Sequence, residues 1–187
     1  MQAKDFFTNL LKDIKTDLAD EFDKNFERKA FFDTPWAQRK LRPSDNLLNV
    51  HGGQGLRGSI KASIAGDGKI LFTSSLPYAS IHNEGGILVI TAKMKKYFWA
   101  MYYQSSNALI YSTKTKAVRN NKRNAALSSD AAYWKALALK KVGDKLTIPK
   151  RQYIGNHPNV KTIVKQDIDN AVVRLGKQIG IDMKKNK

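Results

Sequence analysis

The chain has 187 residues, with 33 Lys and Arg against 16 Asp and Glu, no cysteine and a net charge of +17. A chain of this length suits a single domain with a sizeable core. The lack of cysteine excludes disulfides and thiolate metal sites, and no apolar run reaches the roughly 18 residues of a transmembrane helix. The charged start, with Lys4 and Asp5, lacks the apolar core of a signal peptide, so we expect synthesis in a cytoplasm and no membrane partner.

The positive charge is concentrated in the middle of the chain. Residues 86–159 hold fourteen basic and two acidic residues, a net of +12, whereas residues 1–30 have a net of −1. A surface that serves only solubility usually mixes both signs. The concentration of one sign therefore favours a polyanionic partner or an acidic protein surface.

Long amphipathic helices are predicted near both ends of the chain. Over residues 3–30, and again over residues 160–180, apolar residues recur at spacings of three and four. Two interpretations of the first apolar stripe stay open: it packs on a sheet of the same chain, or part of it packs on a neighbouring subunit. The tail at residues 183–187 is expected to fray.

A β-hairpin is predicted over residues 59–75. Apolar and polar residues alternate from Ile60 to Ile64, Gly66-Asp67-Gly68 supplies a turn, and the return strand alternates in the same way. Short strands are also predicted at residues 87–90 and 146–148. The expected fold class is α+β, with a small antiparallel sheet built on the hairpin and flanked by the terminal helices.

No cofactor, metal site or catalytic residue is predicted. The segment Gly53 to Gly58 matches G-x-G-x-x-G, but the residues after it alternate as a strand, whereas a dinucleotide site needs a helix there. A hydrolase needs a nucleophile with a base, and a nuclease needs several acids around a metal ion. Residues 56–159 contain four acids, so we expect a protein that is not an enzyme. Glu84 is expected to pair with Arg57 or Arg151.

The basic middle of the chain allows more than one interpretation. Residues 92–106 predict a short helix that is buried on several sides, or one whose aromatic residues stack nucleobases beside lysines. Residues 107–129, here called the basic arm, have little apolar periodicity and are either a solvated insertion or a segment that orders against nucleic acid or an adjoining subunit. Its candidate contact residues are Lys114, Lys116, Arg119, Lys122 and Arg123. A helix is expected to begin after Asp130 as its N-cap.

Three short motifs follow one another in the chain. A turn into a strand reads Leu56-Arg57-Gly58-Ser59. The glycine-ended motif, a predicted turn-rich loop, contains Tyr78, Ala79, His82, Gly85 and Gly86. The late motif contains Pro149, Arg151, Tyr153 and Gly155, with Tyr153 expected in the core and Arg151 on the surface.

With the amphipathic helices around them, these motifs resemble the phage virion-morphogenesis family, whose members are also described as tail-completion or neck proteins of Mu-like and lambdoid tailed phages. The resemblance covers most of residues 1–180. The basic arm departs from the family pattern, as does a lysine between the proline and the arginine of the late motif.

The resemblance implies a non-enzymatic virion component that assembles as a ring, with sixfold symmetry implied by the family, where head meets tail. Its expected partners are copies of itself, connector or adaptor proteins, and tail-terminator or tail-tube proteins. A positive lining suits packaged DNA, because phosphates attract lysine and arginine without sequence reading. The alternative function is sequence-independent nucleic-acid binding, and in both cases residues 1–187 are expected to form one domain that carries the basic arm.

Overall fold

A computed structural model describes residues 3–38, 48 and 55–185 of the chain. Its contacts divide the chain into two compact units. Unit 1 comprises Met1–Trp36, Asn46–Glu84 and Lys150–Lys187, and unit 2 comprises Ala37–Asp45 and Gly85–Pro149. The predicted α+β class is confirmed, since long helices occur together with small antiparallel ladders. The expectation of a single domain stays a prediction.

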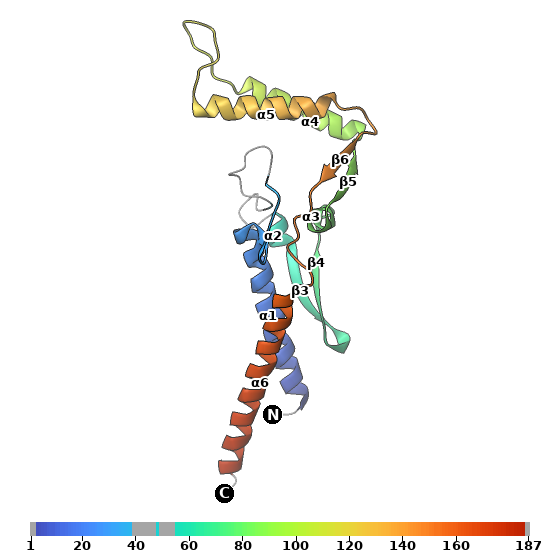
Figure 1. Ribbon diagram of the computed structural model, residues 1–187, viewed down its shortest axis with the longest axis vertical. Helices are drawn as coiled ribbons and strands as arrows, with labels where there is room; N and C mark the ends of the chain where they lie inside the picture. The colour runs from blue at the N-terminus through green and yellow to red at the C-terminus, as the bar shows by residue number, and fades with distance from the viewer. Residues whose placement is uncertain (1–2, 39–47, 49–54, 186–187) are drawn as a thin grey trace. The chain divides into compact units, whose positions relative to one another are not determined.

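Two long helices form the frame of unit 1. Helix α1 (Ala3–Arg28) and helix α6 (Pro158–Lys185) run antiparallel, side by side (Figure 1). The apolar stripe of α1 is buried and packs against the first turns of α6; the two sets are Ile14, Leu18 and Phe22, and Val160, Ile163 and Val164. Both predicted amphipathic helices are thus confirmed, and α6 continues to Lys185, three residues into the tail that was expected to fray.

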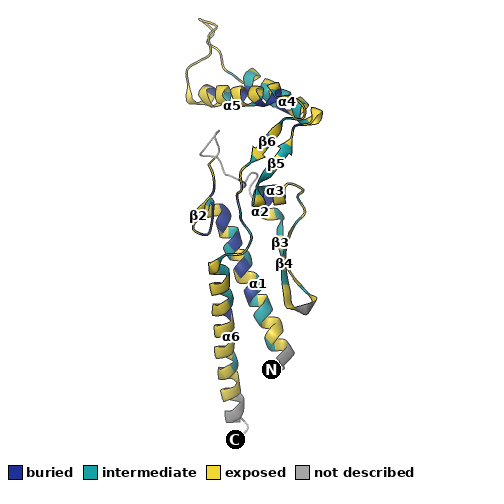
Figure 2. Ribbon diagram, turned by 45° about the vertical axis from the view of Figure 1, so that its right-hand side comes forward, coloured by how far each residue is buried: buried dark blue, intermediate teal, exposed yellow. Residues whose placement is uncertain are grey.

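The predicted hairpin packs on α1. Strands β3 (Ile60–Ala65) and β4 (Lys69–Ser74) pair antiparallel around a single 3-10 turn, η1 (Gly66–Gly68), in which Gly68 has a φ of 70°. The ring of Phe72 on β4 meets Phe22 of α1 edge to face, with centroids 5.0 Å apart. Figure 2 shows the buried residues of unit 1 concentrated along α1. The first helix stripe therefore packs within the chain, on the hairpin and α6. Directly after α1, strands β1 (Ala30–Phe31) and β2 (Thr34–Pro35) pair antiparallel over two residues each.

Two segments expected as turns are helical. Helix α2 (Leu56–Ser59) is one turn that leads into β3, and helix α3 (Ala79–Glu84) occupies the predicted loop. In α3, the backbone N–H of Ala79 donates to the carbonyl of Leu76 at 3.0 Å, so the chain coils directly after Pro77. The prediction failed because six residues are too few to display a helical period in the sequence.

Unit 2 contains a strand pair and a helix pair. Strands β5 (Gly86–Val89) and β6 (Lys145–Ile148) pair antiparallel, and helices α4 (Ala92–Asn107) and α5 (Lys122–Leu139) lie side by side (Figure 1). Their shared core consists of Ile90, Phe98, Leu137 and Ala138. The two predicted strands exist, but they form a ladder of their own and do not extend the hairpin. Alternation alone identifies a strand and leaves its partner open.

Helix α5 begins nine residues before the predicted start. Its N-cap is Asn121, whose side-chain oxygen accepts a hydrogen bond from the N–H of Asn124 at 2.8 Å. Asp130, the predicted cap, lies buried in the middle of the helix. The last eight residues of the basic arm, 122–129, are therefore helical, and residues 108–121 form the connection between α4 and α5. None of the described helices is both long and apolar enough to cross a membrane.

Candidate functional site

The structure brings the glycine-ended motif and the late motif together inside unit 1. The hydroxyl of Tyr153 donates to the backbone carbonyl of Ala79 at 2.8 Å, and its ring packs on Phe26 of α1 with centroids 5.0 Å apart. The backbone N–H of Arg151 donates to the carbonyl of His82 at 2.8 Å. Residues 70 positions apart in sequence thus form one hydrogen-bonded contact between α3 and residues 151–154.

Two asparagines that the sequence analysis did not single out complete this contact. The side-chain oxygen of Asn83 accepts hydrogen bonds from the N–H groups of Tyr153 and Ile154, at 3.0 and 3.1 Å. The buried amide of Asn25 donates to the carbonyl of Tyr153 at 3.1 Å and accepts from the N–H of Phe32 at 3.0 Å. Buried backbone groups need such partners because they have lost water. An asparagine in a polar-looking helix or loop carries no sequence signal for this role.

The phenol of Tyr153 keeps its proton in this contact. Burial, with the charge of Glu84 as a second cause, raises the pKa of Tyr153 to about 12. Its phenol is therefore a hydrogen-bond donor throughout the physiological range. Tyr153 is buried as predicted, but Arg151 is also buried, contrary to the prediction, because its segment lies against α3.

The remaining motif residues lie where the chain passes between units. Two of these passages join Glu84 to Gly85 and Pro149 to Lys150. Gly85 has a φ of 76°, which an L side chain rarely adopts, so glycine suits the backbone conformation that the connection from α3 to β5 requires. Gly86 pairs with Ile148 in the ladder that Pro149 ends. Gly155, also at positive φ, closes the late motif.

The first motif places an ion pair on α1. Arg57 on α2 binds both carboxylate oxygens of Asp23 and donates to Glu27 at 2.7 Å. These are the acids that Arg57 contacts, and the sequence analysis had expected Glu84. The spacing of Asp23 and Glu27 by four residues places both carboxylates on one face of the helix, within reach of one guanidinium. The expected pairing of Glu84 with Arg151 stays a prediction.

Of the G-x-G-x-x-G segment, residues 53 and 54 lie outside the described part of the chain.

A buried asparagine also anchors the base of the basic arm through hydrogen bonds. The side chain of Asn124, 2% exposed, accepts from the N–H of Ile110 at 3.0 Å and donates to the carbonyls of Ile110 and Arg119, both at 2.7 Å. Tyr111 and Val118 then form a β-bridge, and the loop closes beyond them. The loop thus has a hydrogen-bonded base formed by the chain itself, and both interpretations of this segment stay predictions.

All five candidate contact residues of the arm are exposed: Lys114 and Lys116 in the loop, Arg119 beside its base, and Lys122 and Arg123 in the first turn of α5. Of the acids of unit 2, the structure describes Asp130 and Asp144, and neither does much to offset them. Asp130 is buried, and a carboxylate oxygen of Asp144 accepts from the N–H of Lys141 at 2.8 Å within a turn. The arm therefore presents a cluster of positive charges to solvent. Such a cluster attracts polyanions.

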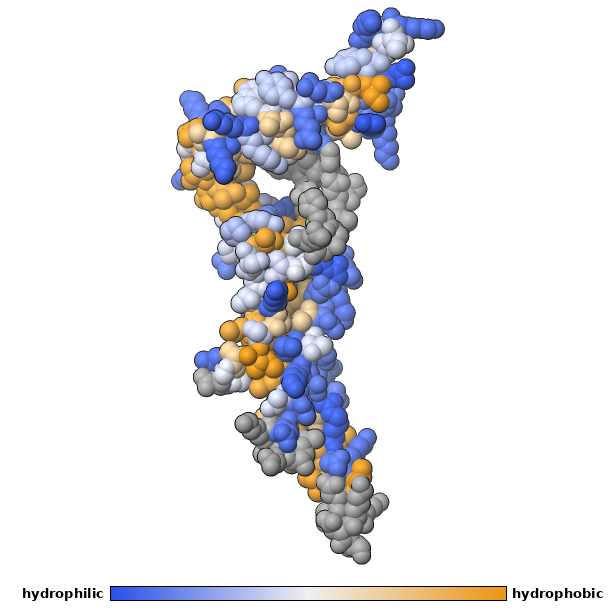
Figure 3. Space-filling model, turned by 180° about the vertical axis from the view of Figure 1, so that it is seen from behind, coloured by the Kyte–Doolittle hydropathy of each residue, from blue (hydrophilic) through white to orange (hydrophobic). Residues whose placement is uncertain are grey.

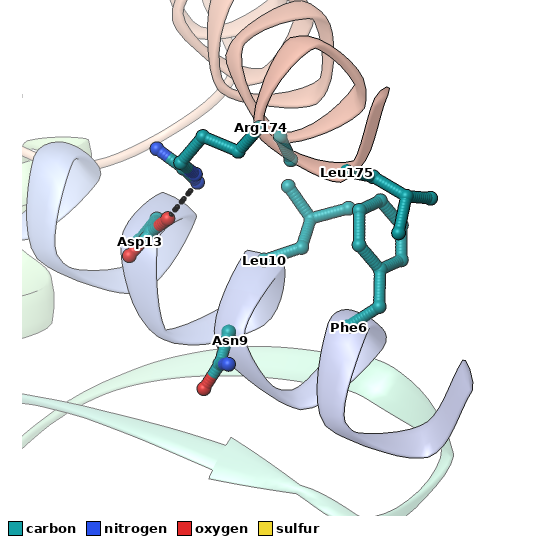
Figure 4. A pocket seen from close by; sticks show the side chains of 7 residues that line it. Phe6, Asn9, Leu10, Asp13, Arg174 and Leu175 are labelled. Atoms are coloured by element: carbon teal, nitrogen blue, oxygen red, sulfur yellow. Dashed lines mark hydrogen bonds and ion pairs between the residues drawn. The ribbon is translucent and has the colours of Figure 1, made fainter. Parts of the chain in front are cut away.

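Unit 1 contains an open hollow between α1 and α6, about 370 Å³ in volume (Figure 4). Its walls are mainly apolar, from Phe6, Leu10 and Leu175, and Arg174 pairs with Asp13 across it at 2.5 Å. Among the described residues there is no group of three acids or histidines that would hold a metal ion. We assign this hollow no chemistry.

A buried carboxyl lies on the same helix pair. Asp167 on α6 is 6% exposed, and its pKa is raised to about 6 by burial first, then by a hydrogen bond with Asp17 and by the charges of Asp17 and Asp13. Arg174 acts in the opposite direction. The carboxyl of Asp167 thus favours its protonated form where α1 packs on α6.

No protein-family model, no curated protein and no solved structure matches this chain.

Proposed function

We propose that this protein is a structural, non-enzymatic component of a tailed-phage virion, which assembles as a ring at the head–tail junction. The resemblance of the motifs points to this class of protein. One structural observation supports a role in assembly: several large apolar side chains of unit 2 are exposed to solvent. Ile87 and Val89 on β5 are 58% and 53% exposed, and Leu139 and Val142 at the end of α5 are 64% and 59% exposed.

The strand pair of unit 2 has an exposed apolar face, which burial against another surface would stabilise. Two strands alone are marginally stable in water, and a ribbon with apolar residues on both faces can bury only one face on its own helices. Ile87 and Val89 lie on one face of β5, and Leu88 lies on the other with its partner Leu146. Figure 3 shows hydrophobic side chains gathered where β5 and β6 meet the helices of unit 2. Exposed apolar groups of this kind favour protein–protein contact.

The partners follow from the same proposal. Copies of this chain cover one another's apolar surfaces around the ring, since a head-to-tail contact closes when the rotation per subunit closes. Connector or adaptor proteins lie on one side, and tail-terminator or tail-tube proteins on the other. The protein is made in the host cytoplasm and ends in the virion.

Mass spectrometry of purified particles tests this proposal. We expect the chain among the particle proteins, and Val142→Glu to reduce its incorporation at least tenfold while the purified variant keeps the wild-type circular dichroism spectrum. Lys141→Gln is the matched control, because Lys141 is exposed in the same turn and is already polar. Absence of the wild-type chain from particles would overturn the proposal.

A second candidate function, sequence-independent nucleic-acid binding, is favoured by the exposed cations on the ordered basic arm. The affinity of such a protein falls steeply as salt rises. The two functions are compatible, because a ring around packaged DNA uses both properties.

A further inference from the structure

One flank of α4 carries a stacked pair of aromatic rings. Trp99 and Tyr103 lie one helical turn apart, with ring centroids 5.9 Å apart and ring planes inclined by 27°. Trp99 is partly buried against the core of unit 2, which holds it in place, whereas Tyr103 is 55% exposed. The pair therefore presents a fixed aromatic surface to solvent.

Three lysines lie on the same part of unit 2 as this pair. Lys95 and Lys96 precede Trp99 by four and three residues, the spacing that places side chains next to one another on a helix. From α5, the ammonium of Lys135 lies 5.9 Å from the ring centroid of Tyr102, which itself contacts Trp99 at 5.7 Å. Helix α4 contains no acid, and the one acid of α5, Asp130, is buried.

We infer that this flank of α4 binds single-stranded nucleic acid. An unpaired base stacks on the aromatic surface of Trp99 and Tyr103, and its neighbouring phosphates lie against the lysines. Stacking on an aromatic ring contributes about 1 to 3 kcal/mol per base and tolerates any sequence, because every base has a π face. A duplex covers its base faces with neighbouring base pairs, so it would use the lysines alone. An acidic protein would likewise leave the rings unused.

The other aromatic residues of α4 serve packing. Phe98 is buried, and Tyr97 meets Trp134 of α5 edge to face with centroids 5.8 Å apart. Tyr97 and Tyr103 are six residues apart and thus point about 120° apart around the helix. They have the same exposed fraction, 55%, so Tyr97 is a matched control for Tyr103.

Fluorescence anisotropy of the full-length protein with a labelled oligothymidylate of about 15 nucleotides tests the site. We expect Tyr103→Ala to weaken binding by about tenfold, Tyr103→Phe to retain it because the ring remains, and Tyr97→Ala to change it by less than about twofold. Lys95→Gln with Lys135→Gln should weaken binding and reduce its salt dependence. Thermal unfolding of each variant checks that unit 2 stays folded.

Three results would overturn the inference: no binding of the oligothymidylate at low salt, equal losses for Tyr103→Ala and Tyr97→Ala, or tighter binding of a duplex of the same length that Tyr103→Ala leaves unchanged. Quenching of tryptophan fluorescence gives a second readout, since Trp99→Phe should remove the part of the quenching that the bound base causes. The inference does not depend on the virion role, whose test is incorporation into particles.

Discussion

The hydroxyl of Tyr153 donates a hydrogen bond to the backbone carbonyl of Ala79, 74 positions earlier in the chain, at 2.8 Å. This bond joins the late motif to the glycine-ended motif. Both residues are buried, so the motifs on which the family resemblance depends act by holding unit 1 together. They position the ends of the chain that enter and leave unit 2.

Removal of this hydroxyl should destabilise unit 1. Tyr153→Phe leaves the buried carbonyl of Ala79 without its donor, at a cost of about 1 to 2 kcal/mol. Urea denaturation should show a lower midpoint with an unchanged slope. Tyr103→Phe, which removes a hydroxyl from an exposed ring, is the control and should unfold like the wild type. Equal midpoints for Tyr153→Phe and the wild type would contradict the role given to this bond.

Asn124 should control the order of the basic arm. Asn124→Ala removes three hydrogen bonds to Ile110 and Arg119 and leaves the N–H of Ile110 without its acceptor, whereas the two carbonyls keep bonds from the N–H groups of Arg119 and Asn121. We expect amide exchange of Ile110 to accelerate by at least tenfold, measured by hydrogen–deuterium exchange. Asn107→Ala, at an exposed position at the end of α4, should leave that rate unchanged. An unaltered rate in Asn124→Ala would mean that other contacts hold the arm.

The stability of unit 1 should depend on pH through Asp167. Its pKa in the folded protein is about 6, above the usual 3.8, so the folded state binds this proton more tightly than the unfolded state. The contribution of Asp167 to stability therefore grows as pH falls from about 6 to about 4, and ionisation above pH 6 costs about 1 to 3 kcal/mol.

Asp167→Asn mimics the protonated carboxyl and tests this dependence. The variant should be more stable than the wild type at pH 7.5, and the difference should disappear near pH 4, as measured by thermal unfolding across pH. Asp169→Asn changes an exposed acid on the same helix and should not alter the pH profile. Parallel profiles for Asp167→Asn and the wild type would refute the assignment.

Charge on the basic arm should determine how tightly the protein binds polyanions. Replacement of the five candidate cations, Lys114, Lys116, Arg119, Lys122 and Arg123, by Gln should lower the salt concentration at which the protein elutes from DNA-cellulose. Each phosphate contact that is lost reduces the slope of log affinity against log salt by about 0.7 to 0.9. The control replaces Lys161, Lys165 and Lys177 of α6, which are exposed in unit 1. An equal shift in both variants would show that net charge matters and the arm does not.

Much of the secondary structure was predictable from the sequence. The stripes of α1 and α6 and the alternation of β3 and β4 are long enough to identify each element from its own residues, because burial of one face imposes a period. Helix α3 and the start of α5 were missed. The first is too short to show a period, and the second depends on a cap at Asn121 in a stretch whose lysines and asparagines predict a loop equally well.

The sequence by itself determined the charge asymmetry, the two amphipathic helices, the hairpin and the α+β class, because these depend on residues close together in the chain. Only the tertiary structure decided that β5 pairs with β6, that Arg57 binds Asp23 and Glu27, and that Asn83 joins α3 to Tyr153. Pairings over such separations depend on the whole packing arrangement, since a strand edge, a carboxylate or an amide will accept any partner of suitable chemistry. The same packing distinguished Tyr103 from Tyr97, two tyrosines on one helix of which one is stacked beside lysines and the other meets a neighbouring helix.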